Sequence, residues 1–198
     1  MNPIIQTYCH TIKQRSSKLT DEALAYWIKG LTVTELKSKQ VYIEADAFQK
    51  EIGYVHSGLL RAFYTDEQGN EITVNFIPEN NYATYCTSLD TPKPSKYNFQ
   101  CIETSVIINV SYNHIHDCSE KFPELERYFR LIVEDVHRNI LSRMEGFLFD
   151  NAENRYLNFM KQFPDLYQRI SLSDLSTYLG IERQSLTRIR KKIAKNSL

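Results

Sequence analysis

The sequence lacks several features that would assign a compartment or a cofactor directly. No run of about eighteen apolar residues occurs, so we expect no membrane-spanning helix. The N-terminus has no basic start followed by an apolar stretch, which argues against a secretory signal. The four cysteines, Cys9, Cys86, Cys101 and Cys118, are scattered and form no CxxC pair. This spacing predicts no zinc or dithiol site and favours reduced thiols in a cytoplasmic protein without metal or cofactor.

Glycine is also scarce: the chain has six, and none lies between Gly69 and Gly146. A backbone cradle for a phosphate group usually needs glycine, so this stretch is not expected to hold one. The sequence also shows no Ser–His–acid arrangement and no phosphate loop. We therefore do not expect an enzyme.

One pattern keeps an enzyme alternative open. His114, His116 and Glu120 have the local spacing of the metal site in cupin barrels, where imidazole and carboxylate ligands hold one metal ion. The glycines that flank this motif in cupins are absent, and the segment reads as a short helix. Residues two apart on a helix point to different faces. We therefore expect two exposed or capping histidines and no metal site.

The chain has no net charge, yet its charges are unevenly divided. Residues 151–198 carry nine Lys and Arg against four Asp and Glu, a net charge of +5, which leaves −5 for residues 1–150. This asymmetry indicates a C-terminal module that faces a polyanion and an N-terminal module that does not. A solvated helix face would also account for the basic residues, so charge alone does not decide.

The hydrophobic pattern changes along the chain and predicts an α+β fold. Residues 1–31 have helical spacing, with a helix start at Thr20–Glu22. Residues 32–111 contain short runs rich in β-branched and aromatic residues, from VYIEADAF to SVIINVS, separated by turn signals. Such runs predict a sandwich or barrel. Residues 122–149 then predict one long helix, and residues 152–163 predict another.

The long helix carries an apolar seam with near-coiled-coil spacing. Its members follow one another at steps of four or three residues: Phe129, Val133, Val136, Ile140, Met144 and Phe147. Packing against the chain's own β-domain would need only a stripe of this kind. Because a helix this long extends beyond the face of a small barrel, we expect part of the seam to pair with a second copy in a homodimer.

Residues 170–193 predict two short helices around a glycine turn. Ser171 and Asp174 form a capping-box-like start, and Gly180 fits the residue just past a helix C-terminus. The apolar residues give each helix one buried face, at Leu172, Leu175, Leu179, Leu186, Ile189 and Ile193. The other faces of the second helix are polar and basic, which is typical of a helix-turn-helix that reads DNA.

The exposed residues of this second helix suit contact with double-stranded DNA. We assign base contacts to Arg183, Gln184 and Arg188, because an Arg fork reads guanine and Gln can pair with adenine. Hydroxyls and further cations suit the sugar–phosphate backbone. The residues assigned to it are Ser185, Thr187, Arg190, Lys191 and Lys192.

The stretch GIERQSLTRIRKKI resembles the recognition helix of the Crp/Fnr family, named after the cyclic-AMP receptor protein and the fumarate–nitrate regulator. The family pattern of Arg, a polar residue, Ser or Thr and then Arg matches Arg183, Gln184, Ser185 and Arg188. The stretch YVHSGLLRAFYTDEQGNEITVNF looks like the core hairpins of the family's β-roll. The resemblance covers nearly the whole chain.

The resemblance implies three parts in a fixed order. Residues 1–120 would form a β-roll sensor of the cyclic-nucleotide-binding-like type (a jelly roll) with flanking helices, residues 121–150 a dimerisation helix, and residues 151–198 the DNA-binding helix-turn-helix. Too few residues follow Ile193 for a hairpin wing, so the last part is expected to be all-helical or a truncated winged form. The resemblance also implies transcription regulation at a pseudo-palindromic operator, with RNA polymerase as a further partner.

The family's effector motifs are missing. Members that bind cyclic nucleotide use a Gly–Glu pair and an Arg–Ser/Thr pair, and Tyr82–Thr84 and Pro94–Lys96 stand at about those places. We therefore expect no cyclic AMP, and control either by another small ligand or by none. A pocket for another ligand would be lined by Tyr82, Thr84, Tyr85, Ser95, Lys96 and Tyr97, although these aromatics fit an ordinary core as well.

Two further expectations follow from the resemblance. The oxygen-sensing branch of the family holds an iron–sulfur cluster on closely spaced N-terminal cysteines, and only Cys9 lies near the N-terminus here, so no cluster is expected. A second function stays open beside the regulator. The chain could be a module that binds cyclic nucleotide or another small ligand, with a remnant helix-turn-helix that contacts protein.

Overall fold

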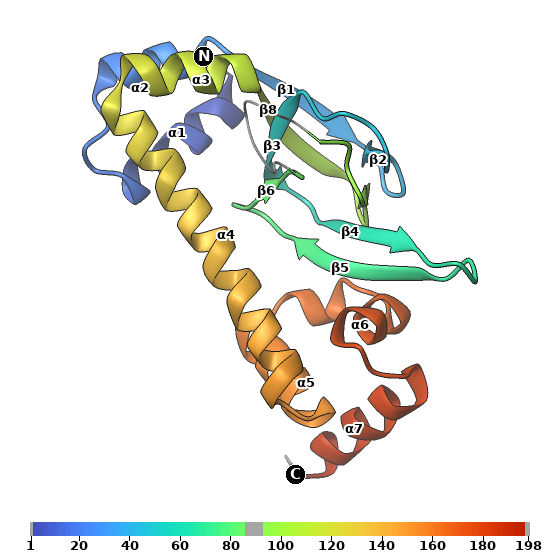
Figure 1. The fold of residues 1–198 in the computed structure, drawn as a ribbon. Helices are drawn as coiled ribbons and strands as arrows, with labels where there is room; N and C mark the ends of the chain where they lie inside the picture. Colours follow the sequence, from blue (N-terminus) through green and yellow to red (C-terminus); the bar gives the residue numbers. More distant parts are fainter. Residues whose placement is uncertain (1, 86–92, 197–198) are drawn as a thin grey trace.

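The computed structural model describes residues 2–85 and 93–196 (Figure 1). Helices pack at one end of a β-roll, a long helix runs from that end past the roll, and a helical unit lies beside the far end of the long helix. This order of elements confirms the predicted α+β class. Within these two ranges, no helix combines the length and the apolar character that a membrane span requires.

Two helices open the described chain. α1 spans Pro3–Arg15 and α2 spans Asp21–Ile28. The Thr20 hydroxyl accepts the amide hydrogen of Ala23 and caps α2, so the predicted helix start is confirmed. The helical stretch expected over residues 1–31 is therefore two helices with a break between them.

In the described ranges, eight strands form two four-stranded antiparallel sheets. One sheet has the order β1-β8-β3-β6 and the other the order β2-β7-β4-β5, which confirms the predicted sandwich-like roll. The strands span Leu31–Leu36 (β1), Val41–Ile43 (β2), Glu51–Ser57 (β3), Leu60–Thr65 (β4), Glu71–Ile77 (β5), Tyr82–Ala83 (β6), Asn98–Cys101 (β7) and Ser105–Ser111 (β8). Their inward side chains fill the roll with apolar groups, among them Val55, Leu60, Ile77, Phe99 and Ile107.

The strand boundaries differ from the sequence pattern at the start of the roll. β1 precedes the first predicted run and pairs with β8 along its whole length, from Leu31 opposite Val110 to Leu36 opposite Ser105. The run VYIEADAF is a strand only as far as Ile43. It ends there because the chain turns at Asp46, whose φ of 64° lies outside the extended region.

α3 and α4 connect the roll to the C-terminal unit. α3 spans Tyr112–Lys121, and α4 spans Pro123–Phe149 with its proline in the first turn. The long helix predicted over residues 122–149 is confirmed. Its first turns bury Leu125 and Tyr128 against α1 and α2, and its remaining length continues past the roll (Figure 1).

The C-terminal unit consists of α5 (Ala152–Gln162), the short helix η1 (Leu166–Gln168), α6 (Leu172–Leu179) and α7 (Arg183–Asn196). α6 lies against β5, and α7 lies beyond it, farther from the roll (Figure 1). The predicted helices over residues 152–163 and on either side of Gly180 are confirmed. The pattern gave no sign of η1, because a three-residue helix is too short to show periodicity.

Candidate nucleic-acid interface

α6 and α7 form a helix-turn-helix whose local geometry follows from a few residues. The Ser171 hydroxyl accepts the amide hydrogen of Asp174 at 3.0 Å and donates to its carboxylate at 2.7 Å, so the predicted cap is confirmed. Gly180 ends α6 with a φ of 62°, the left-handed conformation expected there. Leu175 and Leu186 are buried and hold the two helices together.

Gly180 has a second constraint besides its φ. A Cβ atom built on it would lie 2.8 Å from Cε1 of Phe147 on α4. We expect Gly180→Ala to lower the free energy of unfolding by about 1–3 kcal/mol, from strained backbone and from this clash. Urea unfolding of the full chain measures it. Gly69→Ala is the matched control, because Gly69 also has positive φ but nothing within 4 Å. Equal losses in the two variants would contradict the contact with Phe147.

α7 presents the residues assigned to base contacts on its outer face. Arg183, Gln184 and Arg188 are exposed, and Leu186 on the opposite face is fully buried. The guanidinium of Arg188 donates to the Ser185 hydroxyl at 3.2 Å, a contact that leaves further donors of its fork unused. Two guanidinium groups and one side-chain amide are therefore exposed on α7, and these are the groups that can hydrogen-bond to base edges in the major groove of DNA.

The residues assigned to the DNA backbone are less uniform than the sequence suggested. Lys191 is exposed, and the Thr187 hydroxyl donates to the Arg183 carbonyl. Arg190 turns towards the protein, with its guanidinium 4.9 Å from the ring of Tyr167 and a hydrogen bond to that hydroxyl at 3.2 Å. Its geometry makes Arg190 a packing residue of the C-terminal unit.

Two lysines further along α7 change the assignment. Lys192 is exposed but forms an ion pair of 2.7 Å with Glu153 on α5, which partly neutralises it. Lys195 is exposed one turn beyond Lys191 and was not assigned a contact. The spacing of Arg188, Lys191 and Lys195 could have indicated it, because residues three and four apart share a helix face.

The apolar seam of α4 divides between two surroundings. Phe129 packs on Trp27 at a ring distance of 5.1 Å and so belongs to the core of its own chain, which corrects its assignment to the dimer helix. The next four members, Val133, Val136, Ile140 and Met144, are between 45% and 65% exposed. Phe147 is 45% exposed and touches Gly180. The seam from Val133 to Met144 is thus an uncovered apolar strip, and Phe147 packs against the C-terminal unit of its own chain.

The six residues proposed to line an effector pocket do not meet in one place. The Tyr82 hydroxyl lies between those of Tyr8 and Tyr128, at 3.0 and 2.8 Å, beneath the N-terminal helices. Burial raises the pKa of Tyr82 well above its usual value and that of Tyr128 to about 12, so the phenols stay neutral. Tyr82 is therefore a structural residue, and its assignment to the effector pocket is corrected.

The other five members of that set lie in or beside the roll. Tyr85 and Tyr97 meet edge to face with ring centres 5.5 Å apart and pack on the roll core. The buried Ser95 hydroxyl donates to the Tyr97 carbonyl, and Lys96 is exposed. Thr84 hydrogen-bonds to Gln49. Residues 86–92, which the sequence places between these groups, lie outside the described ranges, as does Cys86.

The histidines of the cupin-like pattern also separate. His114 is half-buried, and its ring nitrogen lies 3.0 Å from the Trp27 carbonyl in the last turn of α2, which is a capping contact. His116 is exposed, 3.7 Å from Glu120. Across the described residues, no group of three or more His, Cys, Asp or Glu is placed to hold a metal ion. Cys9, Cys101 and Cys118 are buried free thiols.

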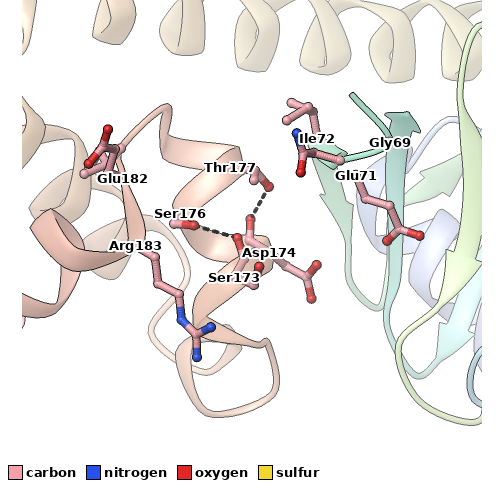
Figure 2. Close-up of a pocket in the computed structure, with 11 residues that line it drawn as sticks. Gly69, Glu71, Ile72, Ser173, Asp174, Ser176, Thr177, Glu182 and Arg183 are labelled. Atoms are coloured by element: carbon pink, nitrogen blue, oxygen red, sulfur yellow. Dashed lines mark hydrogen bonds between the residues drawn. The ribbon is translucent and has the colours of Figure 1, made fainter. Parts of the chain in front are cut away.

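A cleft of about 530 Å³ lies between the tip of the β4–β5 hairpin and the helix-turn-helix, beside the contacts that join β5 to α6. Figure 2 shows Glu71 and Ile72 on the hairpin side, Asp174 and Thr177 on the α6 side, and Arg183 at the edge. Arg183 thus borders this cleft, whereas the other two residues assigned to base contacts, Gln184 and Arg188, lie on the exposed face of α7 outside it.

A β-roll followed by a long helix and a C-terminal helix-turn-helix is the architecture of Crp/Fnr regulators of transcription. Among solved structures, FixK2 from Bradyrhizobium japonicum matches with a TM-score of 0.74 at 12% identity, over 84% of this chain and 86% of that one. A putative Crp/Fnr regulator from Eubacterium rectale matches with a TM-score of 0.67 at 12% identity, over 91% of this chain and 86% of that one. These likenesses confirm the predicted fold.

Relatives in sequence are regulators of the same kind. The anaerobic regulatory protein of Pasteurella multocida is 22% identical over 177 residues, which are 81% of this chain and 62% of that protein. Electron transport regulator A of Shewanella oneidensis is 22% identical over 174 residues, which are 82% of this chain and 68% of that protein. No family model matches. The resemblance to the Crp/Fnr family is confirmed, although the chain spans only 62% and 68% of the length of these two relatives.

Proposed function

We propose that this protein is a homodimeric regulator of transcription in the cytoplasm that binds a specific DNA sequence through α7. The outer face of α7 is the observation that carries this proposal. Gln184, Arg188 and Lys191 are exposed along one side of this helix, which begins just after a glycine turn, and Arg183 is exposed in its first turn. Arginine forks and an amide suit base edges, and a lysine at the end of the same face suits phosphates.

The exposed strip on α4 supports a homodimer. Apolar side chains of this number on one helix are costly in water, and a second copy of the same strip would cover them. A two-fold dimer would place two copies of α7 about 34 Å apart and so match a pseudo-palindromic operator. RNA polymerase remains a proposed further partner.

The roll supports control by a small ligand other than cyclic AMP, or by none. Its described interior is filled by apolar side chains, and Tyr85 and Tyr97 pack on that core. Ser95 stands near the place of the family's phosphate-binding pair, and its hydroxyl donates a hydrogen bond to the Tyr97 carbonyl. Lys96 could meet a phosphate only as a point charge, without the two-pronged geometry of Arg.

DNA binding at two salt concentrations tests the proposal. We expect selection from a random DNA pool to enrich an inverted repeat, and the affinity for it to fall by about 10³–10⁵ between 50 and 200 mM salt if six to ten phosphates are contacted. Gel shifts with the selected DNA measure it. Failure to enrich any sequence, with no salt-dependent shift, would favour the alternative in which the helix-turn-helix contacts protein.

A further inference from the structure

The C-terminal unit does not close a hydrophobic core by itself. Leu59 and Phe76, two buried residues of the roll, belong to the same apolar cluster as Phe159 and Leu175 of the C-terminal unit. The Phe76 ring lies 5.0 Å from that of Tyr178 and 6.2 Å from that of Phe159. The helix-turn-helix is therefore built directly on the outer face of the β4–β5 sheet. Apolar contact is non-directional, however, and by itself allows a packed helix to slide or rotate.

Directional contacts come from arginines on both sides of this junction. Arg169, just before α6, donates to both carboxylate oxygens of Glu79 at 3.1 and 2.7 Å and also reaches Glu103. The two acceptors follow different strands, since Glu79 comes after β5 and Glu103 stands between β7 and β8. A two-pronged pair fixes orientation as well as distance.

The second arginine points the opposite way. Arg61 on β4 is 8% exposed and binds Asp174 in the first turn of α6 as well as Glu71 on β5. Beside it, the Thr73 amide donates to the Thr177 hydroxyl at 3.1 Å. We call the contacts of Arg169 with Glu79 and Glu103, and of Arg61 with Asp174, the arginine clamps.

A third point holds the other end of α6. Arg143 on α4 donates to the carbonyls of Val74 on β5 and Tyr178 on α6, and its guanidinium lies 4.0 Å from the centre of the Tyr178 ring. The arginine clamps contact the chain just before α6 and in its first turn, and Arg143 contacts its last turn. Contacts at both ends of a helix prevent it from pivoting about either end.

The charge states suit permanent contacts. Burial is the largest single influence and would raise the pKa of Glu79, but the hydrogen bonds from Arg169 and from backbone amides, together with the positive charge of Arg169, outweigh it and lower this pKa below its usual value. Hydrogen bonds to Glu79 and Glu103 raise the pKa of Arg169 further above its already high value. The pair is therefore ionised at every pH near neutrality.

We propose that the arginine clamps fix the orientation of α7 on the roll, so that the DNA-reading helix is positioned without a bound effector. The proposal rests on the proposed function and deepens it. α7 packs on α6 through Leu186 and Leu175, so whatever holds α6 also sets the direction in which the outer face of α7 points. Arg61 and Arg169 are thus positioning residues, because they act on DNA only through α6.

Removing negative charge from the roll distinguishes a positioning role of the clamps from a purely electrostatic effect on DNA binding, because the two predict opposite changes in affinity. Glu79→Gln with Glu103→Gln removes two negative charges, which by itself would strengthen binding to DNA. Loss of the Arg169 clamp predicts the opposite, a fall in affinity for the selected DNA of about tenfold. Gln keeps an oxygen that can accept the Gly58 amide hydrogen now bound by Glu79 at 3.1 Å, so the turn should persist. Glu35→Gln with Glu44→Gln, at two exposed positions of the roll, is the control with the same change of charge.

Hydrogen exchange of the full chain, without DNA, gives the second readout. The double Gln variant is expected to exchange amides over residues 166–179 about tenfold faster than the wild type, while α1 and α2 exchange as before. Arg169→Lys keeps every charge but loses the fork, and it should show a smaller change in the same direction. If the double Gln variant fails to fold, Arg169→Lys alone tests whether the Arg169 clamp holds α6.

Faster exchange over residues 166–179 together with weaker binding would support the clamps. Unchanged exchange, or unchanged or stronger binding relative to the control pair, would overturn them while leaving DNA recognition intact. A dialysed wild type that binds DNA only after a small ligand is added would overturn the effector-free positioning. A wild type that selects no DNA at all would overturn the proposed function, and exchange alone would then decide whether the clamps hold α6.

Discussion

Alanine at Arg183 or Arg188 is expected to weaken binding to the selected operator by about 1–3 kcal/mol and to relax the preference at one base position per half-site. Both side chains are exposed in the first half of α7, the part of a recognition helix that meets base edges. The loss is specific to one base position because, without the arginine guanidinium, the protein no longer distinguishes guanine from the other bases there.

Lys191→Ala should behave differently from the two arginine variants. A lysine that meets phosphate contributes equally on every sequence, so its removal should weaken all operators alike and reduce the salt slope by about one. Lys191 is the better test of a phosphate contact than Lys192, which is already paired with Glu153. Fluorescence anisotropy over a panel of single-base operator variants measures both effects.

Lys18→Ala serves as the control for charge, because Lys18 is exposed between α1 and α2, at the end of the molecule far from α7 (Figure 1). It should leave affinity and preference unchanged. If Arg183→Ala and Lys191→Ala gave the same profile across the operator panel, the division into base and phosphate contacts would be wrong. If Arg183→Ala had no effect on any operator, α7 would not be the reading helix.

The helix-turn-helix could be predicted in detail because its rules are local. Ser171 and Asp174 are three residues apart, and Gly180 supplies its own positive φ, so no distant contact is needed to recognise either signal. The strand Leu31–Leu36 was missed for the opposite reason. It is held by pairing with β8, whose paired residues come 69 to 79 positions later in the chain, and an isolated six-residue run gives little signal.

Composition overestimated the basic surface of the C-terminal module. Arg169 was counted among its cations, yet Glu79 and Glu103 of the roll neutralise it. Lys192 is paired with Glu153 in the same way. Partners separated by 90 or 66 residues leave no periodic pattern in the sequence, so the ion pairs of Arg169 could not be predicted. Apart from Lys192, the exposed cations of α7 are Arg188, Lys191 and Lys195 along one face and Arg183 in the first turn.

The seam of α4 shows where periodicity stops being informative. Phe129 and Val133 are consecutive members of the same apolar stripe, four residues apart. Phe129 nevertheless packs on Trp27, whereas Val133 is 65% exposed. An apolar stripe indicates that a helix face is buried, but it does not indicate whether the same chain or a second copy buries it. The change occurs where α4 extends past the N-terminal helices, so it depends on the length of the helix relative to the domain beside it.

Ile140→Asp is expected to convert the protein to a monomer and to lower its affinity for the inverted repeat by about 10²–10⁴-fold. Ile140 is 61% exposed in the middle of the strip, so the change should cost the folded monomer little. In a dimer, two copies of the aspartate would face one another in an apolar seam and would have to be buried without partners. The loss of affinity follows because two linked half-sites bind more tightly than either alone by about this factor.

Asn139→Asp is the matched control, since Asn139 is the preceding residue of α4, is exposed, and gains the same charge off the apolar strip. Size-exclusion chromatography with light scattering and anisotropy on whole and half operators measure both variants. The monomer should bind a half operator as tightly as the wild type does, because each α7 is held by its own chain. If Ile140→Asp remained dimeric, or bound the whole operator as a monomer with undiminished affinity, the strip would not be the interface that pairs the two reading helices.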